Sequence, residues 1–142
     1  MKKIPILLIL ITSISAFGET IYEANTIVDG MKQNQVITVN LVSNNGRELV
    51  VDEHTIVHRK SLDSDTTLDF SSDNKLAIHC KNIEVAYLLQ SGSSTFTMNG
   101  KITVNKFPTI NGGYEFKPVE KSTSDTSTYK YYQTICKLYG GN

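Results

Sequence analysis

The feature that most constrains this chain is the regular recurrence of turn-forming clusters after residue 18. Short stretches rich in Val, Ile, Thr, Tyr and Phe alternate with clusters of Gly, Asn, Ser and Asp every eight to sixteen residues, and helix periodicity is nearly absent. This alternation is typical of an all-β sandwich, roll or barrel. Eight such breaks predict an antiparallel sandwich or jelly-roll-like domain of about nine strands. The breaks lie at residues 30, 44–46, 61–65, 71–74, 91–94, 99–100, 108–113 and 121–127.

Alternating apolar residues assign a buried face to several stretches, since successive side chains of a strand point to opposite sides. The expected inward set comprises Ile37, Val39 and Leu41, then Leu76, Ile78 and Cys80, then Ile83, Val85, Tyr87 and Leu89. The apolar positions have even numbers from Leu76 to Cys80 and odd numbers from Ile83 onward. A bulge or a turn is therefore expected near Lys81. Residues 82–90 also fit a short helix, because Ile83, Ala86 and Tyr87 share a helical face. We favour the strand.

An Asn-Gly pair that ends at Gly100 is a strong hairpin signal. A two-residue loop would set Phe96 on the opposite face from Ile102 and Val104. A three-residue loop over residues 98–100 keeps these apolar side chains on one face and places the glycine in the left-handed conformation. A continuous strand keeps the parity too. We expect the three-residue hairpin.

Residues 128–139 alternate in the same way and predict a final strand with one wet face. The side chains of one face would be Tyr132, Thr134, Cys136 and Leu138, and those of the other Tyr131, Gln133, Ile135, Lys137 and Tyr139. With Cys136 facing inward, a bridge to Cys80 would tie this strand to the middle of the domain. Residues 121–127 form a polar Ser/Thr tract, which predicts a loop.

The N-terminus predicts a secretory signal peptide over residues 1–18. Two lysines precede an apolar stretch, residues 4–17, of signal-peptide length. A membrane-spanning helix needs roughly twenty residues. Ala16 and Gly18 are small, as signal peptidase requires, so we expect cleavage after Gly18 and a soluble single β-rich domain over residues 19–142. An uncleaved N-terminal anchor is the alternative.

The net charge and the cysteine content limit which ligands the protein can bind and in which compartment it is expected. Without the two lysines of the signal, the chain has 12 basic and 14 acidic residues, a net charge of −2. Nucleic-acid binding, which needs a clustered basic excess, is therefore not expected. Cys80 and Cys136 would enter an oxidising compartment, where a cysteine pair is usually bridged. We predict a Cys80–Cys136 disulfide in a periplasmic or secreted protein, with two free thiols or half of a metal site as the alternatives.

The three histidines do not form a recognisable metal site. His54 and His58 lie four apart, so on one strand they project from the same face about 13 Å apart, too far to share one ion. The β-branched run between them disfavours a helix. His79 beside a free Cys80 would offer a copper or zinc ligand pair, but we expect ordinary solvent-facing strand histidines. No metal and no cofactor are predicted.

Catalytic motifs are missing from the sequence as well. A glycosidase needs two carboxylates at a defined separation, but loop composition explains the acidic residues Asp52, Glu53, Asp63, Asp65 and Asp69. The acidic loop that begins at Asp63 lacks the ligand spacing of a calcium site. Neither a nucleophile elbow nor a glycine-rich phosphate loop is present. We therefore predict no catalytic residue and no enzymatic activity.

Two segments carry a family resemblance. Residues 76–85, Leu-Ala-Ile-His-Cys-Lys-Asn-Ile-Glu-Val, are followed by residues 95–104, Thr-Phe-Thr-Met-Asn-Gly-Lys-Ile-Thr-Val. They resemble the periplasmic lipopolysaccharide-transport jelly-roll family (the organic-solvent-tolerance domain), in which a strand ending in a small residue and a lysine precedes a Gly-x-Val-x-Val strand. The residues that match the second motif are Gly100, Ile102 and Val104. Cys80 replaces the usual Ala or Gly. The resemblance, limited to residues 76–104, implies a twisted, half-open β-fold whose apolar interior binds acyl chains.

These observations predict an exported, non-catalytic protein of a bacterial envelope that binds another protein or a surface ligand and does not span the membrane once its signal is removed. Tyrosine is enriched at interfaces because it buries a large ring and keeps a polar tip. The binding residues that we expect are Tyr129, Tyr131 and Tyr139. The equal alternative for these tyrosines and Tyr132 is that half of them fill the core and the rest are ordinary surface residues. A lipid or glycolipid carrier of the jelly-roll type is the second hypothesis, and a secreted hydrolase or metal-handling protein is the third.

Overall fold

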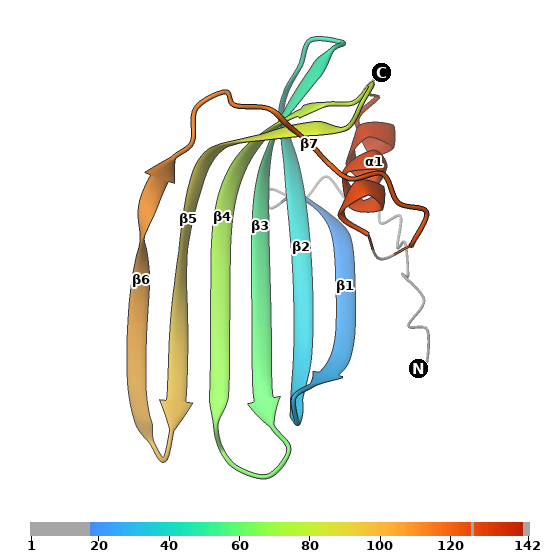
Figure 1. Ribbon diagram of the computed structural model, residues 1–142. Helices are drawn as coiled ribbons and strands as arrows, with labels where there is room; N and C mark the ends of the chain where they lie inside the picture. The colour runs from blue at the N-terminus through green and yellow to red at the C-terminus, as the bar shows by residue number, and fades with distance from the viewer. Residues whose placement is uncertain (1–17, 126, 141–142) are drawn as a thin grey trace.

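The computed structural model describes residues 18–125 and 127–140, which form one long antiparallel sheet and one helix (Figure 1). The first six strands pair in sequence order as a meander: β1 (Glu19–Val28), β2 (Met31–Asn44), β3 (Glu48–Ser61), β4 (Thr67–His79), β5 (Glu84–Met98) and β6 (Lys101–Asn111). A short strand, β7 (Lys117–Pro118), pairs with the start of β5, and helix α1 (Thr128–Leu138) follows. The predicted fold class, antiparallel β with one disulfide, is confirmed. The described residues form seven strands, where about nine were expected, and these make a single sheet instead of a sandwich.

The predicted signal peptide covers residues 1–18, of which residues 1–17 lie outside the described part of the chain, so its presence and its cleavage stay predictions. Within the described part, no helix is long and apolar enough to cross a membrane.

Two of the predicted breaks are wrong, because β4 runs through residues 71–74 and β5 runs through residues 91–94. The turn-forming residues of these two stretches lie opposite one another in the sheet. Ser71 faces Ser93, with their hydroxyl oxygens 3.1 Å apart, and Ser72 faces Gly92. The small polar side chains therefore satisfy each other inside the sheet, and neither strand ends there.

The hairpin between β5 and β6 has the tight form, so the predicted three-residue loop is wrong. Met98 lies opposite Lys101, and the two loop residues, Asn99 and Gly100, have φ angles of 50° and 74°. These positive φ values are those of the two-residue hairpin that favours Asn-Gly. Phe96 and Ile102 consequently lie on opposite faces. Every residue of β6 is exposed, and a strand without a buried face does not constrain which residues of the loop pair.

The predictions for residues 75–90 are confirmed in part, since Ile83 and Val85 are buried as expected but Tyr87 is 40% exposed. Leu76 and Ile78 are fully buried, residues 80–83 form the expected turn, and β5 is a strand and not a helix. The register then shifts between β4 and β5, so that Leu88 is buried and Leu89 is 38% exposed. A β-bulge of this kind exchanges the faces of the residues that follow it.

The predicted strand over residues 128–139 is wrong, because these residues form α1. Ser127 caps its first turn, with the side chain accepting a hydrogen bond from the Lys130 backbone N–H at 3.2 Å. The buried residues Tyr132, Ile135 and Cys136 follow the spacing of one helical face. Cys136 therefore faces inward as predicted, but from a helix.

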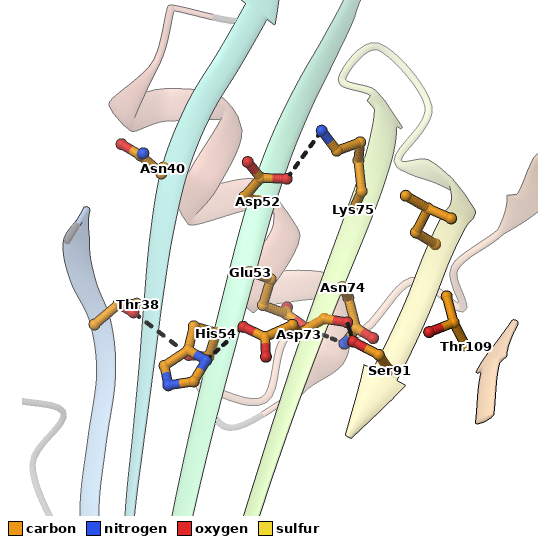
Figure 2. A pocket seen from close by; sticks show the side chains of 11 residues that line it. Thr38, Asn40, Asp52, Glu53, His54, Asp73, Asn74, Lys75, Ser91 and Thr109 are labelled. Carbon is orange, nitrogen blue, oxygen red and sulfur yellow. Dashed lines mark hydrogen bonds and ion pairs between the residues drawn. The ribbon is translucent and has the colours of Figure 1, made fainter. Parts of the chain in front are cut away.

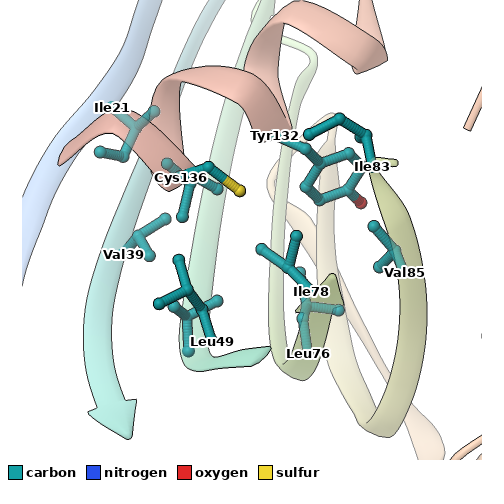
Figure 3. Close-up of a cluster of buried hydrophobic side chains, with 11 residues drawn as sticks. Ile21, Val39, Leu49, Leu76, Ile78, Ile83, Val85, Tyr132 and Cys136 are labelled. Carbon is teal, nitrogen blue, oxygen red and sulfur yellow. The ribbon is translucent and has the colours of Figure 1, made fainter. Parts of the chain in front are cut away.

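Helix α1 packs on one face of the sheet, which we call the helix face, and buries the main core there (Figure 3). The sheet supplies Ile21, Val39, Leu49, Val51, Leu76, Ile78 and Val85, and the turn before β5 supplies Ile83. The predicted disulfide is present between Cys80 and Cys136. It links the turn after β4 to the helix, and a bridge of this kind is consistent with an extracellular or periplasmic location.

The opposite face, which we call the outer face, has a smaller core. It consists of Val50, Ala77, Ala86 and Leu88, and Phe116 packs against it from the segment that leads to β7. Gly112 allows this segment to cross close to the sheet: its N–H donates to the Leu88 carbonyl at 3.1 Å, and a Cβ there would lie 2.0 Å from the Tyr87 carbonyl oxygen. The apolar packing thus lies at one end of the sheet, and the other ends of the strands extend beyond α1 (Figure 1).

Candidate functional site

A cavity of about 360 Å³, lined mostly by residues with polar side chains, lies on the outer face, where β2 to β6 pass side by side (Figure 2). Its lining residues are Thr38, Asn40, Asp52, Glu53, His54, Asp73, Asn74, Lys75, Leu89, Ser91 and Thr109. Two contacts join its side chains: His54 Nδ1 lies 2.7 Å from Asp73 Oδ1, and Lys75 Nζ lies 3.4 Å from Asp52 Oδ1. With Glu53, the lining contains three carboxylates, one lysine and one histidine.

The His54–Asp73 pair has two of the parts of a catalytic triad but not the third. Ser91 is opposite Asp73, yet its hydroxyl donates to the Asp73 backbone carbonyl at 3.4 Å. In the described residues, no hydroxyl or thiol lies within hydrogen-bond distance of the His54 ring. The two side chains are 42% and 67% exposed, so water screens the pair. A general base needs contact with the group whose proton it removes, and this geometry does not supply that contact.

The other two histidines are also paired with carboxylates. His58 contacts Asp69 across β3 and β4, four residue pairs along from the His54–Asp73 pair, so the two histidines contact different carboxylates. His79 lies between Glu48 and Glu84, with its two ring nitrogens 3.3 Å and 3.2 Å from their carboxylates. Because the two carboxylates contact different nitrogens, they do not surround one ion position. Within the described residues, no group of three or more His, Cys, Asp or Glu could hold a metal ion.

His79 has a second contact, which is structural. Its ring stacks on Phe116 with centroids 3.6 Å apart and planes 8° from parallel. Phe116 belongs to the segment that crosses the outer face before β7. The histidine therefore holds this segment against the end of the sheet.

The part of the helix face that α1 leaves uncovered carries a set of half-buried and exposed apolar side chains, which we call the apolar patch. Its members come from all six strands of the meander, β1 to β6. They are Val28, Met31, Val57, Leu68, Phe70, Phe96, Met98, Phe107 and Ile110. The register places all of them on the same side as the core residues Leu49 and Leu76. Met98 and Phe107 are each 48% exposed and Ile110 is 55% exposed.

Gly92 shapes the centre of the apolar patch. A Cβ at this position would lie 2.8 Å from the Ser71 carbonyl oxygen and 3.4 Å from the Phe107 ring. The missing side chain leaves room for Phe107 to lean across β5 toward Phe70, and the two ring centroids are 6.2 Å apart. A residue that sequence analysis assigned to a turn therefore lets two aromatic rings from β4 and β6 meet.

The charged side chains beside the apolar patch are basic. Arg59 lies on the same face, and its Nε donates to Gln33 Oε1 at 2.7 Å. Lys101 stands at the end of β6 on that face, opposite Met98. On the same face, Glu53 is buried under α1 at 8% exposure, and the exposed Glu19 lies opposite Val39, at the other end of β1 from the patch residue Val28. The part of the helix face around the apolar patch thus combines apolar area with positive charge.

The predicted binding tyrosines lie on and next to α1, partly buried against the core. Tyr129, Tyr131 and Tyr139 all pack against the main cluster. The Tyr131 hydroxyl donates to Glu53 Oε2 at 2.6 Å, and the Tyr139 hydroxyl donates to the Val39 carbonyl at 2.9 Å. Tyr132 is buried, with its hydroxyl 3.0 Å from that of Tyr87. These contacts fix the helix to the sheet, and a role of the tyrosines in binding a partner stays a prediction.

Glu53 is the residue whose role the sequence concealed. We explained it by loop composition, but it lies in β3, and its carboxylate accepts hydrogen bonds from Tyr131 and from Asn74 Nδ2, the latter at 2.8 Å. Burial, together with the neighbouring Glu53 carboxylate, raises the pKa of Tyr131 far above the ordinary value for tyrosine. Burial and the Tyr87 hydroxyl do the same for the pKa of Tyr132. The sequence did contain one signal: Glu53 is two residues after Val51, so in a strand the two side chains point to the same, inward face.

Comparisons with protein-family models, with curated proteins and with solved structures found no match. The resemblance of residues 76–104 to the lipopolysaccharide-transport family therefore stays a prediction.

Proposed function

We propose that this chain is an exported, non-catalytic binding protein of a bacterial envelope, and that the apolar patch is its binding surface for a protein or another surface ligand. The observation that carries the proposal is the incomplete second layer of the fold. A sheet is stable when its apolar face is buried against another element. Helix α1 supplies that element for only one end of the helix face.

The residue types in the patch are those typical of binding surfaces. Large contiguous apolar areas on soluble domains mark interaction sites, and aromatic, Met and Arg side chains are enriched at interfaces. The patch contains three phenylalanines and two methionines, with Arg59 beside them. Phe70 and Phe107 are already in contact, so part of the surface is ordered before a ligand arrives.

The same surface favours a second candidate, a lipid or glycolipid carrier. Arg59 and Lys101 lie on the patch side of the sheet, so an acyl chain would meet apolar side chains while an anionic head group met a cation. Guanidinium groups bind phosphate and carboxylate through a planar set of donors. This candidate is consistent with what the family resemblance implies.

A matched pair of variants tests the surface. The double variant Met98→Ser and Phe107→Ser removes two patch side chains that are each 48% exposed. The control, Ile56→Ser and Leu62→Ser, removes side chains that are 47% and 49% exposed and lie outside the patch. We expect the patch variant alone to lose ligands that co-purify with the exported protein, with at least a tenfold reduction.

Analysis of the material bound to the native protein separates the two candidates. A co-purifying protein lost in the patch variant supports the protein-binding function, and extracted acyl chains lost in the patch variant support the carrier. Equal recovery of ligands by the patch variant and by the control would overturn the proposal.

A further inference from the structure

The meander ends in two strands, β1 and β6, that each have one neighbour in the described sheet. Every residue of β6, from Lys101 to Asn111, is exposed. An uncovered edge strand presents unpaired N–H and C=O groups, which pair readily with another strand. Ile27 on β1 and Ile102 on β6, at 67% and 65%, are the most exposed large aliphatic side chains of the described chain.

The strand register connects these two edges row by row. Ile27 and Ile102 end one cross-strand row, whose inner members are Lys32, Lys60, Thr67 and Thr97. A second row runs from Glu23 to Lys106 through Val36, Ile56, Ser71 and Ser93. A third row runs from Tyr22 to Phe107 through Ile37, Thr55, Ser72 and Gly92. Residues that end one row lie at the same height on the sheet and point to the same face.

The direction of the strands makes the two edges complementary. Because consecutive strands of the meander are antiparallel, β1 and β6 run in opposite directions. A second copy placed beside the first, in the same orientation and without a shift along the strands, would therefore set its β1 antiparallel to β6. We propose that β6 of one copy pairs with β1 of the next copy in this register. The facing pairs would be Lys101–Val28, Ile102–Ile27, Thr103–Thr26, Lys106–Glu23 and Phe107–Tyr22.

The chemistry of the facing pairs supports the register. The basic residues of β6 are Lys101 and Lys106, whereas β1 carries the acidic residues Glu19 and Glu23. In the described chain neither Glu23 nor Lys106 has an ion-pair partner of its own. Opposite charges, aromatic pairs and threonine pairs that face each other across antiparallel strands are stabilising.

The stretches of β1 and β6 that pair without a register shift also end at the same level of the sheet. The β1 register shifts between Thr20 and Tyr22, and the β6 register shifts after Phe107, beside Pro108. Both irregularities lie just beyond the Tyr22–Phe107 row. Proline lacks the N–H that continued pairing requires. Each edge is therefore suitable for pairing over the same rows, and pairing stops at the same level on both.

The charges also exclude the symmetric alternative. If β6 paired with β6 of a second copy, the two lysines of each strand would face an edge with no acidic residue, and β1 pairing with β1 would join two acidic edges. The β6–β1 contact is heterologous, so each added copy leaves one edge of each kind free and the assembly grows as an open chain. This inference uses the strand edges and does not depend on what the apolar patch binds.

Site-specific crosslinking tests the pairing. Purified protein carrying Ile27→Cys is mixed with tagged protein carrying Ile102→Cys, and mild oxidation is followed by non-reducing electrophoresis. We expect the mixed dimer to be the main product. A single molecule carrying both changes cannot close a bridge internally, because the edges are five strand spacings, roughly 24 Å, apart; it should give a ladder of oligomers. Dimers of the Ile102→Cys protein with itself, or no crosslinked product, would overturn the proposal.

Charge exchange provides an independent measurement by sedimentation velocity. Lys106→Glu and Glu23→Lys should each weaken self-association about tenfold, since each sets like charges opposite one another. The double exchange should restore it to within about twofold of the original protein. Lys121→Glu and Glu120→Lys, exposed charges that belong to neither β1 nor β6, are the matched controls and should leave association unchanged. Equal association of all these variants, or no association of the original protein at any concentration, would refute the pairing.

Discussion

At the scale of single residues, the contacts of Glu53 connect the sheet to the helix. Its carboxylate is buried and receives one hydrogen bond from the helix, through Tyr131, and one from β4, through Asn74. A buried carboxylate is costly unless donors satisfy it. The helix and the sheet therefore depend on each other at this point.

Removal of the Tyr131 hydroxyl should destabilise the protein. Tyr131→Phe leaves one carboxylate oxygen of Glu53 without its donor, and the free energy of unfolding should fall by about 1–3 kcal/mol. Urea denaturation measures this change. Tyr114→Phe, at a tyrosine that is 67% exposed, is the control and should change the unfolding free energy little. Equal effects of the two substitutions would show that the hydrogen bond to Glu53 contributes nothing.

The buried tyrosines also predict how stability depends on pH. The pKa values of Tyr131 and Tyr132 are raised in the folded protein, in each case mainly by burial, and burial raises the pKa of Tyr139 as well. The folded protein therefore keeps these protons at a pH where the unfolded chain has lost them. The contribution to stability is complete below the ordinary tyrosine pKa of about 10 and is lost as the pH rises above it.

Denaturation at a series of pH values from 8 to 11 measures this dependence. The unfolding free energy of the original protein should fall above pH 10, and that of Tyr131→Phe should fall less steeply because one titrating group is gone. A steeper fall in the variant would contradict the assignment.

At the scale of the elements, the strands could be predicted well where one face is buried, and poorly elsewhere. The inward positions Val39, Leu76 and Ile78 were correct because the core constrains their parity. The β5–β6 loop was wrong because β6 has no buried face. Helix α1 was mistaken for a strand because its Tyr, Thr and Ile residues also suit strands, and packing against the sheet decides between the two. The helix signals present were Ser127 as a cap and Gly140, with a φ of 68°, after the last turn.

The candidate site was harder to predict than the fold. The disulfide followed from compartment and parity, but the apolar patch draws residues from six strands, and its members are brought together only by the register of the whole sheet. Leu68 and Phe107, for example, are far apart in the sequence and belong to no local motif. A surface assembled in this way leaves no signal in a single segment.

The disulfide should be essential for holding α1 in place. The bridged cysteines are 56 residues apart, and a loop of that length is worth roughly 4 kcal/mol in the chain-entropy description. Replacing both Cys80 and Cys136 with Ser should therefore lower the unfolding free energy by a few kcal/mol in urea denaturation. The variant should also lose protection from hydrogen exchange first in α1. Unchanged exchange in α1 would mean that the tyrosine contacts alone hold the helix.

At the scale of the whole molecule, the helix completes only half of a two-layer structure. The main core lies between α1 and one end of the sheet, while the rows from Val57 toward the β5–β6 hairpin have an apolar face that no element of residues 18–125 and 127–140 covers. The strands extend beyond α1 as a single layer (Figure 1). A partner or ligand bound there would supply the missing layer, and this is the central claim about how the protein works.

Photo-crosslinking in the producing cells tests that claim most directly. A photoreactive amino acid placed at Phe107 lies in the apolar patch, and one placed at Ile56, which has nearly the same exposure of 47%, lies on the outer face. If the apolar patch is the binding surface, illumination should attach a discrete protein or lipid at position 107 and none at position 56. Adducts of equal yield at both positions, or adducts at position 56 alone, would contradict it.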